Sequence, residues 1–204
     1  MIVHARLCES KVVMPLIVKH HYLHRKVSAR YAFALEQESR VVGAVTFSVP
    51  ASRHMQMSVC PSDPSLVLEL SRLWLCDCLP RNTASQFVWS ALKQLPPLLI
   101  ASYADTSVGH LGTVYRAMNF YYAGWTDQDR KTPRYDYVPA NGKHTRDAFR
   151  SNDYTRVRRK PKIKYWVATG NRRDRKTLKS RCGWPSRPWD GGPNTFSKAK
   201  GETP

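Results

Sequence analysis

Apolar and polar positions alternate along much of the first 125 residues with the period of β-strands. Tyr31–Leu35 and Val41–Val49, on either side of the polar turn Glu36–Arg40, predict a β-hairpin. Leu66–Cys76 carries apolar residues on both faces, which is typical of a central strand. Gly43, inside the second hairpin strand, predicts a bulge or a close backbone approach.

The strand predicted over Leu66–Cys76 also contains two charged residues, Glu69 and Arg72. Charges in such a strand are costly unless they are paired or belong to a site. A structural ion pair of Arg72 with Glu69 or Asp105 and a functional role both fit the pattern. Strict alternation puts Leu66, Leu68, Leu70, Arg72, Trp74 and Cys76 on one face, and Val67, Glu69, Ser71, Leu73 and Leu75 on the other.

Helical spacing recurs between these strands. Pro15 fits the first turn of a helix over Met14–His24, and an apolar stripe up to Leu95 predicts a second helix that Asn82 or Thr83 caps. A strand over Leu98–Tyr103, a helix over Leu111–Met118 and a strand over Phe120–Trp125 follow. This order predicts an α/β fold with helices on a mixed sheet.

The remaining segments are less regular. Met57–Ser65 and residues 127–153 are expected to be loops, Lys162–Thr169 one more strand, and Asn171–Arg181 a short basic helix. The chain is therefore expected to consist of a core over residues 1–125 and a basic extension over 126–181, whose added strands pack on the core. An irregular or disordered tail is expected over 182–204.

The formal net charge of +18 attracts polyanions, of which nucleic acid is the commonest. Arg156–Arg181 alone contains 12 basic residues and 1 acidic residue. The candidate nucleic-acid contacts are Arg156, Arg158, Arg159, Lys160, Lys162, Lys164, Arg172 and Arg173. Tyr165 and Trp166 are interleaved with them and are expected to stack on an unpaired base. The alternative is a solvated basic tail.

The five cysteines are odd in number, and no signal peptide is visible. Free thiols in a reducing cytoplasm are therefore expected. No apolar stretch approaches the roughly 20 residues that span a bilayer, so no membrane partner is expected.

A candidate anion site lies at the junction after the strand Leu66–Cys76. The start of a helix offers free backbone N–H groups, which bind phosphate. The residues at this start are Arg81, Asn82, Thr83, Ala84 and Ser85. A plainly capped helix is the alternative.

A second candidate site follows the strand Leu98–Tyr103. Tyr103 and Asp105 share a face, and Asp105 is suited to take a proton from an amine or to bind a metal. His20 and His24 lie near one helical turn apart, which suits a metal if a carboxylate is close. Phosphate contacts or helix capping are the alternative for these histidines.

Several motifs in one order resemble known families. Tyr115–Gly124, with its "Y…NF…G" ending, resembles the GNAT superfamily of acetyltransferases. The longer block SYADTSVGHLGTVYRAMNFYYAG resembles the phage Mom family of DNA-modification proteins. HHYLHR, YAFALE, VVGAVTF, ELSRLWL, RNTASQFV and KIKYWVATGNRRDRKTL extend the resemblance over residues 18–181.

This resemblance implies a GNAT-like fold with a mostly antiparallel sheet. It also implies an enzyme that converts adenine in double-stranded phage DNA to N6-carbamoylmethyladenine and so protects it from restriction, in the cytoplasm of the infected bacterium. Acetyl-CoA or a related donor, and an iron bound among His20, His21 and His24, are the implied cofactors. The catalytic candidates are His21, Tyr22, Glu69, Asp105 and Tyr115, and Arg72 and Ser85 are expected at the cofactor.

Two other functions stay open at this point. One is an ordinary acetyl-CoA-dependent N-acetyltransferase, and the other is a DNA-binding protein of the same fold without activity. A carbamoylmethyl group is joined to N6 through a methylene carbon, so acyl transfer from a thioester does not by itself give this product. The sequence does not fix the oligomeric state, and a dimer is compatible with it.

Overall fold

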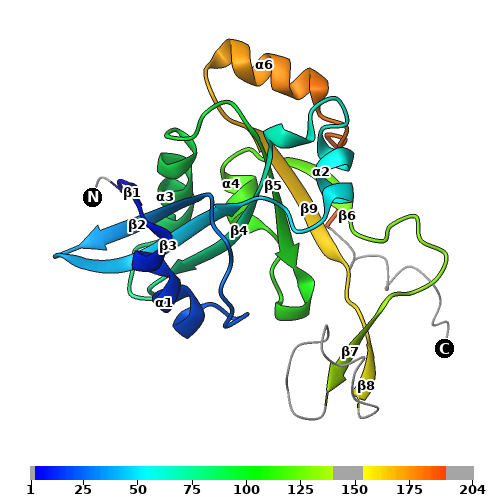
Figure 1. Ribbon diagram of the computed structural model, residues 1–204, viewed down its shortest axis with the longest axis horizontal. Helices are drawn as coiled ribbons and strands as arrows, with labels where there is room; N and C mark the ends of the chain where they lie inside the picture. Colours follow the sequence, from blue (N-terminus) through cyan, green and yellow to red (C-terminus); the bar gives the residue numbers. More distant parts are fainter. Residues whose placement is uncertain (1–2, 140–153, 192–204) are drawn as a thin grey trace.

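The computed structural model describes residues 3–139 and 154–191 (Figure 1). Within these residues, seven strands form one sheet in the order β1-β2-β3-β4-β5-β9-β6, and β7 and β8 pair separately. Every pairing in the large sheet is antiparallel except that of β4 with β5. The strands are β1 Arg6–Cys8, β2 Tyr31–Gln37, β3 Arg40–Ser48, β4 Val67–Leu75, β5 Leu99–Asp105, β6 Tyr121–Trp125, β7 Tyr135–Pro139, β8 Tyr154–Arg158 and β9 Lys162–Ala168. The predicted mixed, mostly antiparallel sheet is thus confirmed.

Helices cover both faces of the large sheet. α3 and α4 pack on one face, where Phe87 and Val88 meet Phe47 and Ile100 in the largest core cluster. α1, α2 and α6 lie on the other face, where smaller clusters contain Val13 of α1 among others. The helices are α1 Ser10–His20, α2 Arg53–Val59, α3 Thr83–Leu92, α4 Thr113–Ala117 and α6 Arg172–Arg181. No helix in the described part of the chain is long and apolar enough to cross a membrane.

The sheet opens where β4 and β5 separate. These two strands pair only at their beginnings, from Val67 opposite Leu99 to Glu69 opposite Ala101. Shortly after the last pair, β4 has a bulge, because Phe47 of β3 pairs with Leu70 whereas the preceding residue of β3 pairs with Arg72. The extra residue bends the strand away from its neighbour.

The bulge residue is Ser71, and hydroxyl groups of β3 hold it in place. Its Oγ lies 3.0 Å from Thr46 Oγ1 and 2.7 Å from Ser48 Oγ, and it also donates to the Thr46 carbonyl oxygen at 3.2 Å. Strict alternation along this strand was therefore a wrong prediction. Leu68 and Leu70 share a core cluster with Leu73 and Leu75, whereas Trp74 packs with α1 on the opposite face.

The predicted hairpin is confirmed as β2 and β3. A register shift lies beside Gly43, and a Cβ there would come within 3.2 Å of Leu35 Cβ and 3.3 Å of Leu75 Cγ. Both expectations for this glycine, a bulge and a close approach, hold.

Several element boundaries differ from the prediction. α1 begins at Ser10 and ends at His20, so Pro15 lies inside it and His24 lies beyond it with a φ of 46°. α2 extends into the expected loop as far as Val59, and β1 was not predicted. Short elements of this kind are fixed by the core they touch rather than by their own periodicity.

The segment after β6 was predicted to be irregular, but it contains β7. Figure 1 shows β7 and β8 projecting from the body at the end away from α6. β9 then enters the large sheet between β5 and β6, so the strand predicted from KIKYWVAT is an interior strand of the sheet.

The beginning of the predicted tail is also ordered. Trp184 is buried, and Arg187 forms a β-bridge with Tyr122. Residues 192–204 lie outside the described residues, and so do residues 140–153 of the loop predicted over 127–153.

Candidate active site

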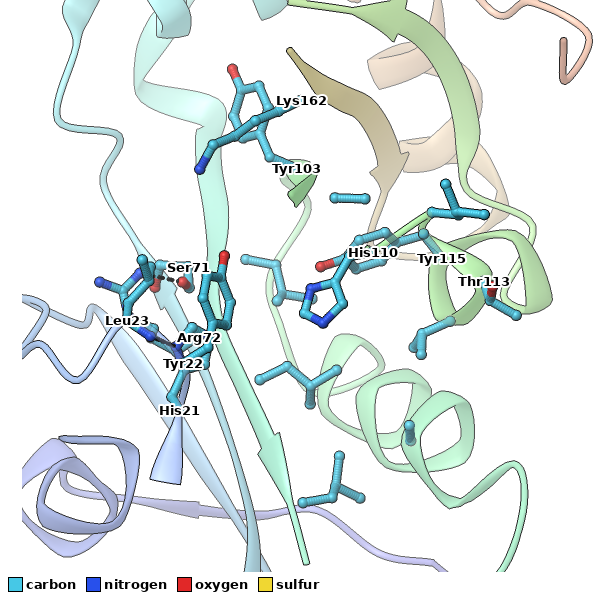
Figure 2. Close-up of a pocket in the computed structure, with 18 of the residues that line it drawn as sticks. His21, Tyr22, Leu23, Ser71, Arg72, Tyr103, His110, Thr113, Tyr115 and Lys162 are labelled. Carbon is cyan, nitrogen blue, oxygen red and sulfur yellow. Dashed lines mark hydrogen bonds between the residues drawn. The ribbon is translucent and has the colours of Figure 1, made fainter. Parts of the chain in front are cut away.

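The opening between β4 and β5 contains a cavity of about 620 Å³. β4, the segment after α1, and the segment from the end of β5 to α4 line it. The lining residues labelled in Figure 2 include His21, Tyr22, Arg72, Tyr103, His110, Tyr115 and Lys162. Glu69 also lines the cavity. The fold therefore gathers side chains from distant parts of the chain at one opening in the sheet.

Asp105, at the end of β5, is buried behind this lining with its oxygens occupied. Lys162 Nζ lies 2.7 Å from Oδ2, while the backbone N–H and hydroxyl of Ser107 donate to Oδ1 at 3.0 and 2.5 Å. Burial raises the pKa of Asp105, but the hydrogen bonds from Lys162 and Ser107 outweigh burial and leave this pKa below its usual value. Asp105 is a fixed anion, poorly suited to accept a further proton.

Glu69 is the second carboxylate of the site and has the opposite environment. It lies on β4 where β4 and β5 separate, and within the described residues its carboxylate has no hydrogen bond and no ion pair within 4 Å. Burial raises its pKa, with a smaller opposing effect from Arg72 and Lys162. Two carboxylates whose pKa values are moved in opposite directions are typical of a division between base and electrostatic partner.

His21 and Tyr22 follow the end of α1 and form the wall opposite His110. The imidazole of His21 is buried, and burial, followed by the nearby Arg72 charge, lowers its pKa to about 4. Its Nδ1 accepts a hydrogen bond from the Leu23 backbone N–H at 3.1 Å, so the neutral ring carries its proton on Nε2. His21 is a hydrogen-bond donor at neutral pH.

Tyr22 stacks on His21 with ring centroids 4.4 Å apart and meets the His110 ring edge-on at 5.4 Å. Its hydroxyl donates to Asp105 Oδ2 at 3.4 Å. Burial and the Asp105 charge raise the pKa of Tyr22 to about 12, so the phenol stays protonated. Tyr22 as a whole is 37% exposed, so this residue is accessible to a ligand in the cavity.

Arg72 contributes a positive charge to the cavity wall. One of its terminal nitrogens donates to the Ser71 carbonyl oxygen at 2.6 Å, while its Nε is buried without a partner among the described residues. Buried N–H groups are rarely left unsatisfied in native proteins, so this donor is suited to a ligand oxygen. The predicted ion pair with a carboxylate is not formed, since neither Glu69 nor Asp105 lies within 4 Å of it.

Tyr115, on α4, lies in the cavity wall and also packs on Phe120 and Tyr165, each with a centroid distance of 5.4 Å. Tyr115 therefore both lines the cavity and packs in the hydrophobic core. Burial raises its pKa, with an opposing effect of the Ser102 hydroxyl, so its phenol is protonated at neutral pH.

The start of α3 touches the cavity through one residue, Ala84. The Asn82 backbone has a φ of 67°, and its side chain makes no capping hydrogen bond. Thr83 and Ser85 turn their hydroxyls back to the carbonyl oxygens of Pro80 and Asn82. Cofactor binding by these residues and by Arg81 stays a prediction.

The three histidines predicted for a metal do not converge. His20 stacks on Trp74 at 4.8 Å, His21 bonds to the Leu23 N–H, and His24 Nδ1 lies 3.0 Å from the Val18 carbonyl oxygen. Across residues 3–139 and 154–191, no group of three His, Cys, Asp or Glu side chains is arranged to hold a metal ion. This arrangement does not fit the expected iron at His20, His21 and His24.

The predicted nucleic-acid contacts fall in three places. Lys162 lies in the cavity wall, where it forms an ion pair with Asp105. Lys164 is half-buried, with its Nζ 5.4 Å from the centroid of the Trp184 ring. Arg172 and Arg173 begin α6. Arg156, Arg158, Arg159 and Lys160 lie on β8 or directly after it.

One part of that prediction is wrong. Tyr165 and Trp166 have exposed fractions of 0% and 1%, because β9 is an interior strand with cores on both faces. Neither ring is available to stack on a base.

The five cysteines are free, as predicted. Cys76 and Cys78 lie with their sulfurs 2.6 Å apart just beyond β4, and Cys78 is exposed.

Sequence reasoning missed the place of Lys162 in the site and gave His110 no role of its own. Lys162 was grouped with a basic run, and only the pairing of β9 with β5 brings it opposite Asp105. For His110 a signal existed, since it follows the polar cluster after Asp105 within a few residues.

The family model for the Mom protein family matches residues 3–181. The chain belongs to the Mom family. A Mom-family relative from Escherichia phage Mu, named methylcarbamoylase Mom, is 31% identical over 116 residues, which are 53% of this chain and 48% of that protein. The chain thus matches about half the length of this curated relative.

Solved acetyltransferase structures are similar to this Mom-family chain in overall fold. An agmatine N-acetyltransferase mutant in its apo form has a TM-score of 0.49 at 11% identity, covering 82% of this chain and 100% of its own. A GNAT-family acetyltransferase from Bacillus cereus has a TM-score of 0.46 at 12% identity, covering 82% and 99%.

Proposed function

We propose that this chain transfers a carbamoylmethyl group to N6 of adenine in phage DNA, within the cytoplasm of the infected bacterium. Membership of the Mom family over residues 3–181 is the observation that carries the proposal, and the name of the phage Mu relative supports the chemistry. The cavity between β4 and β5 is the proposed site of the reaction.

The cavity has the size of a small-molecule site, and such sites range from about 300 to 1,000 Å³. Adenine N6 is paired inside the duplex, so the base must leave the stack before it reacts. Tyr22 presents the partly exposed ring on which the extruded base stacks, and His110 borders the same space.

Formation of the N6–CH2 bond releases one proton from the amino group. Glu69 is the proposed acceptor, because this residue lines the cavity and its carboxyl group has a raised pKa. Asp105 instead holds Lys162 and the Tyr22 hydroxyl in place. Arg72, with its unpartnered Nε, binds an oxygen of the transferred group or of its donor.

The donor is an acyl-CoA or a related compound in this proposal. Ala84 brings the start of α3 to the cavity, and its small side chain leaves room for phosphate near free helix N–H groups. Tyr115, a protonated phenol in the cavity wall, is the proposed proton donor to the leaving group. Since the product has a methylene carbon on N6, attack on a thioester carbonyl does not give it. In the proposed step N6 attacks the methylene carbon of a carbamoylmethyl group on the donor, and the bond from that carbon to the rest of the donor breaks, so that the rest of the donor leaves with the bonding electrons.

The test is nucleoside mass spectrometry on DNA from bacteria that express this chain. We expect deoxyadenosine heavier by a carbamoylmethyl group, and at least a 100-fold loss of it with Glu69→Gln. Glu38→Gln, the same change in an exposed turn, is the matched control and should leave the product unchanged.

Unmodified DNA in cells with abundant folded protein would contradict the proposal. Acetyl transfer to a small amine without DNA would then identify an ordinary N-acetyltransferase. DNA binding that persists without any transfer would identify a binding protein of the same fold.

A further inference from the structure

The ribbon formed by β7 and β8 has two chemically different faces. Residues directly opposite each other in an antiparallel pair point to the same side, and Tyr135 pairs with Arg158 and Tyr137 with Arg156. The aromatic–arginine face therefore consists of Tyr135, Tyr137, Tyr154, Arg156 and Arg158. The Arg156 guanidinium lies 3.8 Å from the Tyr135 ring centroid, and the Tyr137 and Tyr154 rings meet edge-on at 5.0 Å.

The opposite face is neutralised within the ribbon. Arg159, just past the end of β8, forms an ion pair with Asp136, and Nε of this arginine lies 3.0 Å from the carboxylate oxygen Oδ1. On the aromatic–arginine face, neither Arg156 nor Arg158 has a carboxylate partner among the described residues. Among the described residues, the arginines of the ribbon that have no carboxylate partner therefore lie on one side.

Among the described residues, the ribbon forms no hydrophobic core of its own. All five residues of β8 are exposed, and no third strand of the described residues joins the pair. A two-stranded ribbon alone is only marginally stable in water, and exposed strands with aromatic and apolar side chains favour a partner. The charge of its aromatic–arginine face is complementary to a polyanion.

We propose that this ribbon lies in the major groove of duplex DNA with its aromatic–arginine face against the DNA. The proposal rests on the proposed function and names the element that holds the substrate. The major groove of B-form DNA, about 12 Å wide, admits a two-stranded ribbon. Arg156 and Arg158 bind phosphates or guanine edges there, and tyrosine hydroxyls donate to phosphates.

The base of the ribbon is tied to the cavity. Two hydrogen bonds fix the chain after β8: the Arg159 N–H donates to the Arg134 carbonyl oxygen at 2.9 Å, and Thr106 Oγ1 donates to the Pro161 carbonyl oxygen at 2.6 Å. Thr106 directly follows Asp105, and Lys162, the next residue after Pro161, lies on the cavity wall. DNA held on the ribbon therefore lies beside the site where an extruded base would enter.

The test compares two double variants with equal loss of charge. Arg156→Gln with Arg158→Gln alters the aromatic–arginine face, and Arg172→Gln with Arg173→Gln alters the start of α6 at the other end of β9. Binding to a fluorescent 20-base-pair DNA duplex is measured by anisotropy at 100 mM salt. We expect at least a 10-fold weaker affinity for the ribbon variant. Although Arg172 and Arg173 were predicted from the sequence to contact nucleic acid, this proposal places the DNA on the ribbon, so less than a 2-fold change is expected for the α6 variant.

Two further measurements identify the groove. Dimethyl sulfate probes guanine N7 in the major groove, and protection of N7 by the wild type should vanish with the ribbon variant. Double-stranded RNA, whose major groove is deep and narrow, should compete at least 10-fold less well than DNA. Circular dichroism and melting temperatures equal to the wild type establish that both variants are folded.

The outcomes separate this proposal from the proposed function. If the wild type modifies DNA while the ribbon variant binds duplex as tightly as the wild type, the ribbon proposal fails and the function stands. Protection confined to adenine N3 in the minor groove, or equal losses in both double variants, also overturns it. A wild type that binds duplex through the ribbon without modifying it overturns the function alone.

Discussion

The ribbon and α6 are both strongly basic, yet the fold uses their residues differently. α6 has a capping box at its start, where Asn171 and Asp174 bond to each other's backbone N–H groups, and it buries Leu178 against the sheet. The ribbon buries little and presents arginine beside tyrosine next to the cavity. α6 lies at the opposite end of β9 from the ribbon (Figure 1). Their similar charge therefore predicts a polyanion partner for both segments, but it does not determine which of the two contacts the polyanion.

The largest effect on stability is expected from removing the Leu178 side chain, which α6 buries against the sheet. Leu178→Ala should cost about 2–5 kcal/mol of unfolding free energy, because it leaves a cavity in a buried cluster. Urea denaturation gives that loss, and DNA affinity measured on the fraction still folded should stay within 2-fold. A large loss of affinity in folded protein would place α6 in the DNA interface.

Charge reversal on the ribbon is the next largest effect. Arg156→Glu with Arg158→Glu should weaken duplex binding roughly 100-fold, since repulsion replaces two phosphate contacts. The slope of log affinity against log salt should also fall by about 1.8 with the neutral ribbon variant, at about 0.9 per contact. Titrations at several salt concentrations measure both quantities, and an unchanged slope would argue against phosphate contacts on the ribbon.

His21 in the cavity wall should make the unfolding free energy depend on pH, whereas the two basic segments should not. Burial lowers the pKa of His21 to about 4, so the folded protein favours the neutral ring. The stability that depends on this neutral ring is fully present above about pH 6.5, the pKa of an unfolded histidine. It is lost as pH falls toward 4, because the unfolded chain then binds a proton that the folded chain does not. Between pH 7.5 and 4.5 this loss is on the order of 2 kcal/mol. His21→Gln should reduce the difference in unfolding free energy between these pH values, whereas Arg172→Gln should not.

The smallest effect separates two neighbouring arginines. Arg158→Gln should weaken DNA binding about 3- to 5-fold, through the loss of one phosphate contact. Arg159→Gln should change it less than 2-fold, because Asp136 already neutralises Arg159. Its cost in stability should stay below about 1 kcal/mol, as for other exposed ion pairs. Equal effects of the two substitutions on affinity would contradict the two-faced ribbon.

Much of the fold was predictable because long periodic segments decide it. The hairpin of β2 and β3, the central strand β4 and the stripe of α3 follow from apolar spacing alone. The bulge at Ser71 was not predictable, because hydroxyls of Thr46 and Ser48 hold it from another strand. β7 was not predicted, because a ribbon that packs on no core lacks the apolar face by which a strand is identified in a sequence.

The sequence predicted which residues form the site better than it predicted how their side chains are arranged. The sequence placed Glu69, Asp105 and Tyr22 among the candidates. It did not reveal that Asp105 is held by Lys162, since that depends on β9 pairing with β5, or that the Glu69 carboxylate has no hydrogen-bond or ion-pair partner among the described residues. The role of Tyr165 was misjudged because burial on both faces of β9 is a property of the whole sheet.

The place of β9 has a consequence for synthesis of the chain. β5 and β6 emerge from the ribosome long before β9, which pairs with both of them. Until then each exposes an open edge, and non-local pairing of this kind is slow to form and prone to aggregation. The wall that carries Lys162 is completed only after residues 162–168 have been translated. Translation that stops earlier yields a chain that lacks both Lys162 of the cavity wall and the strand that joins β5 to β6.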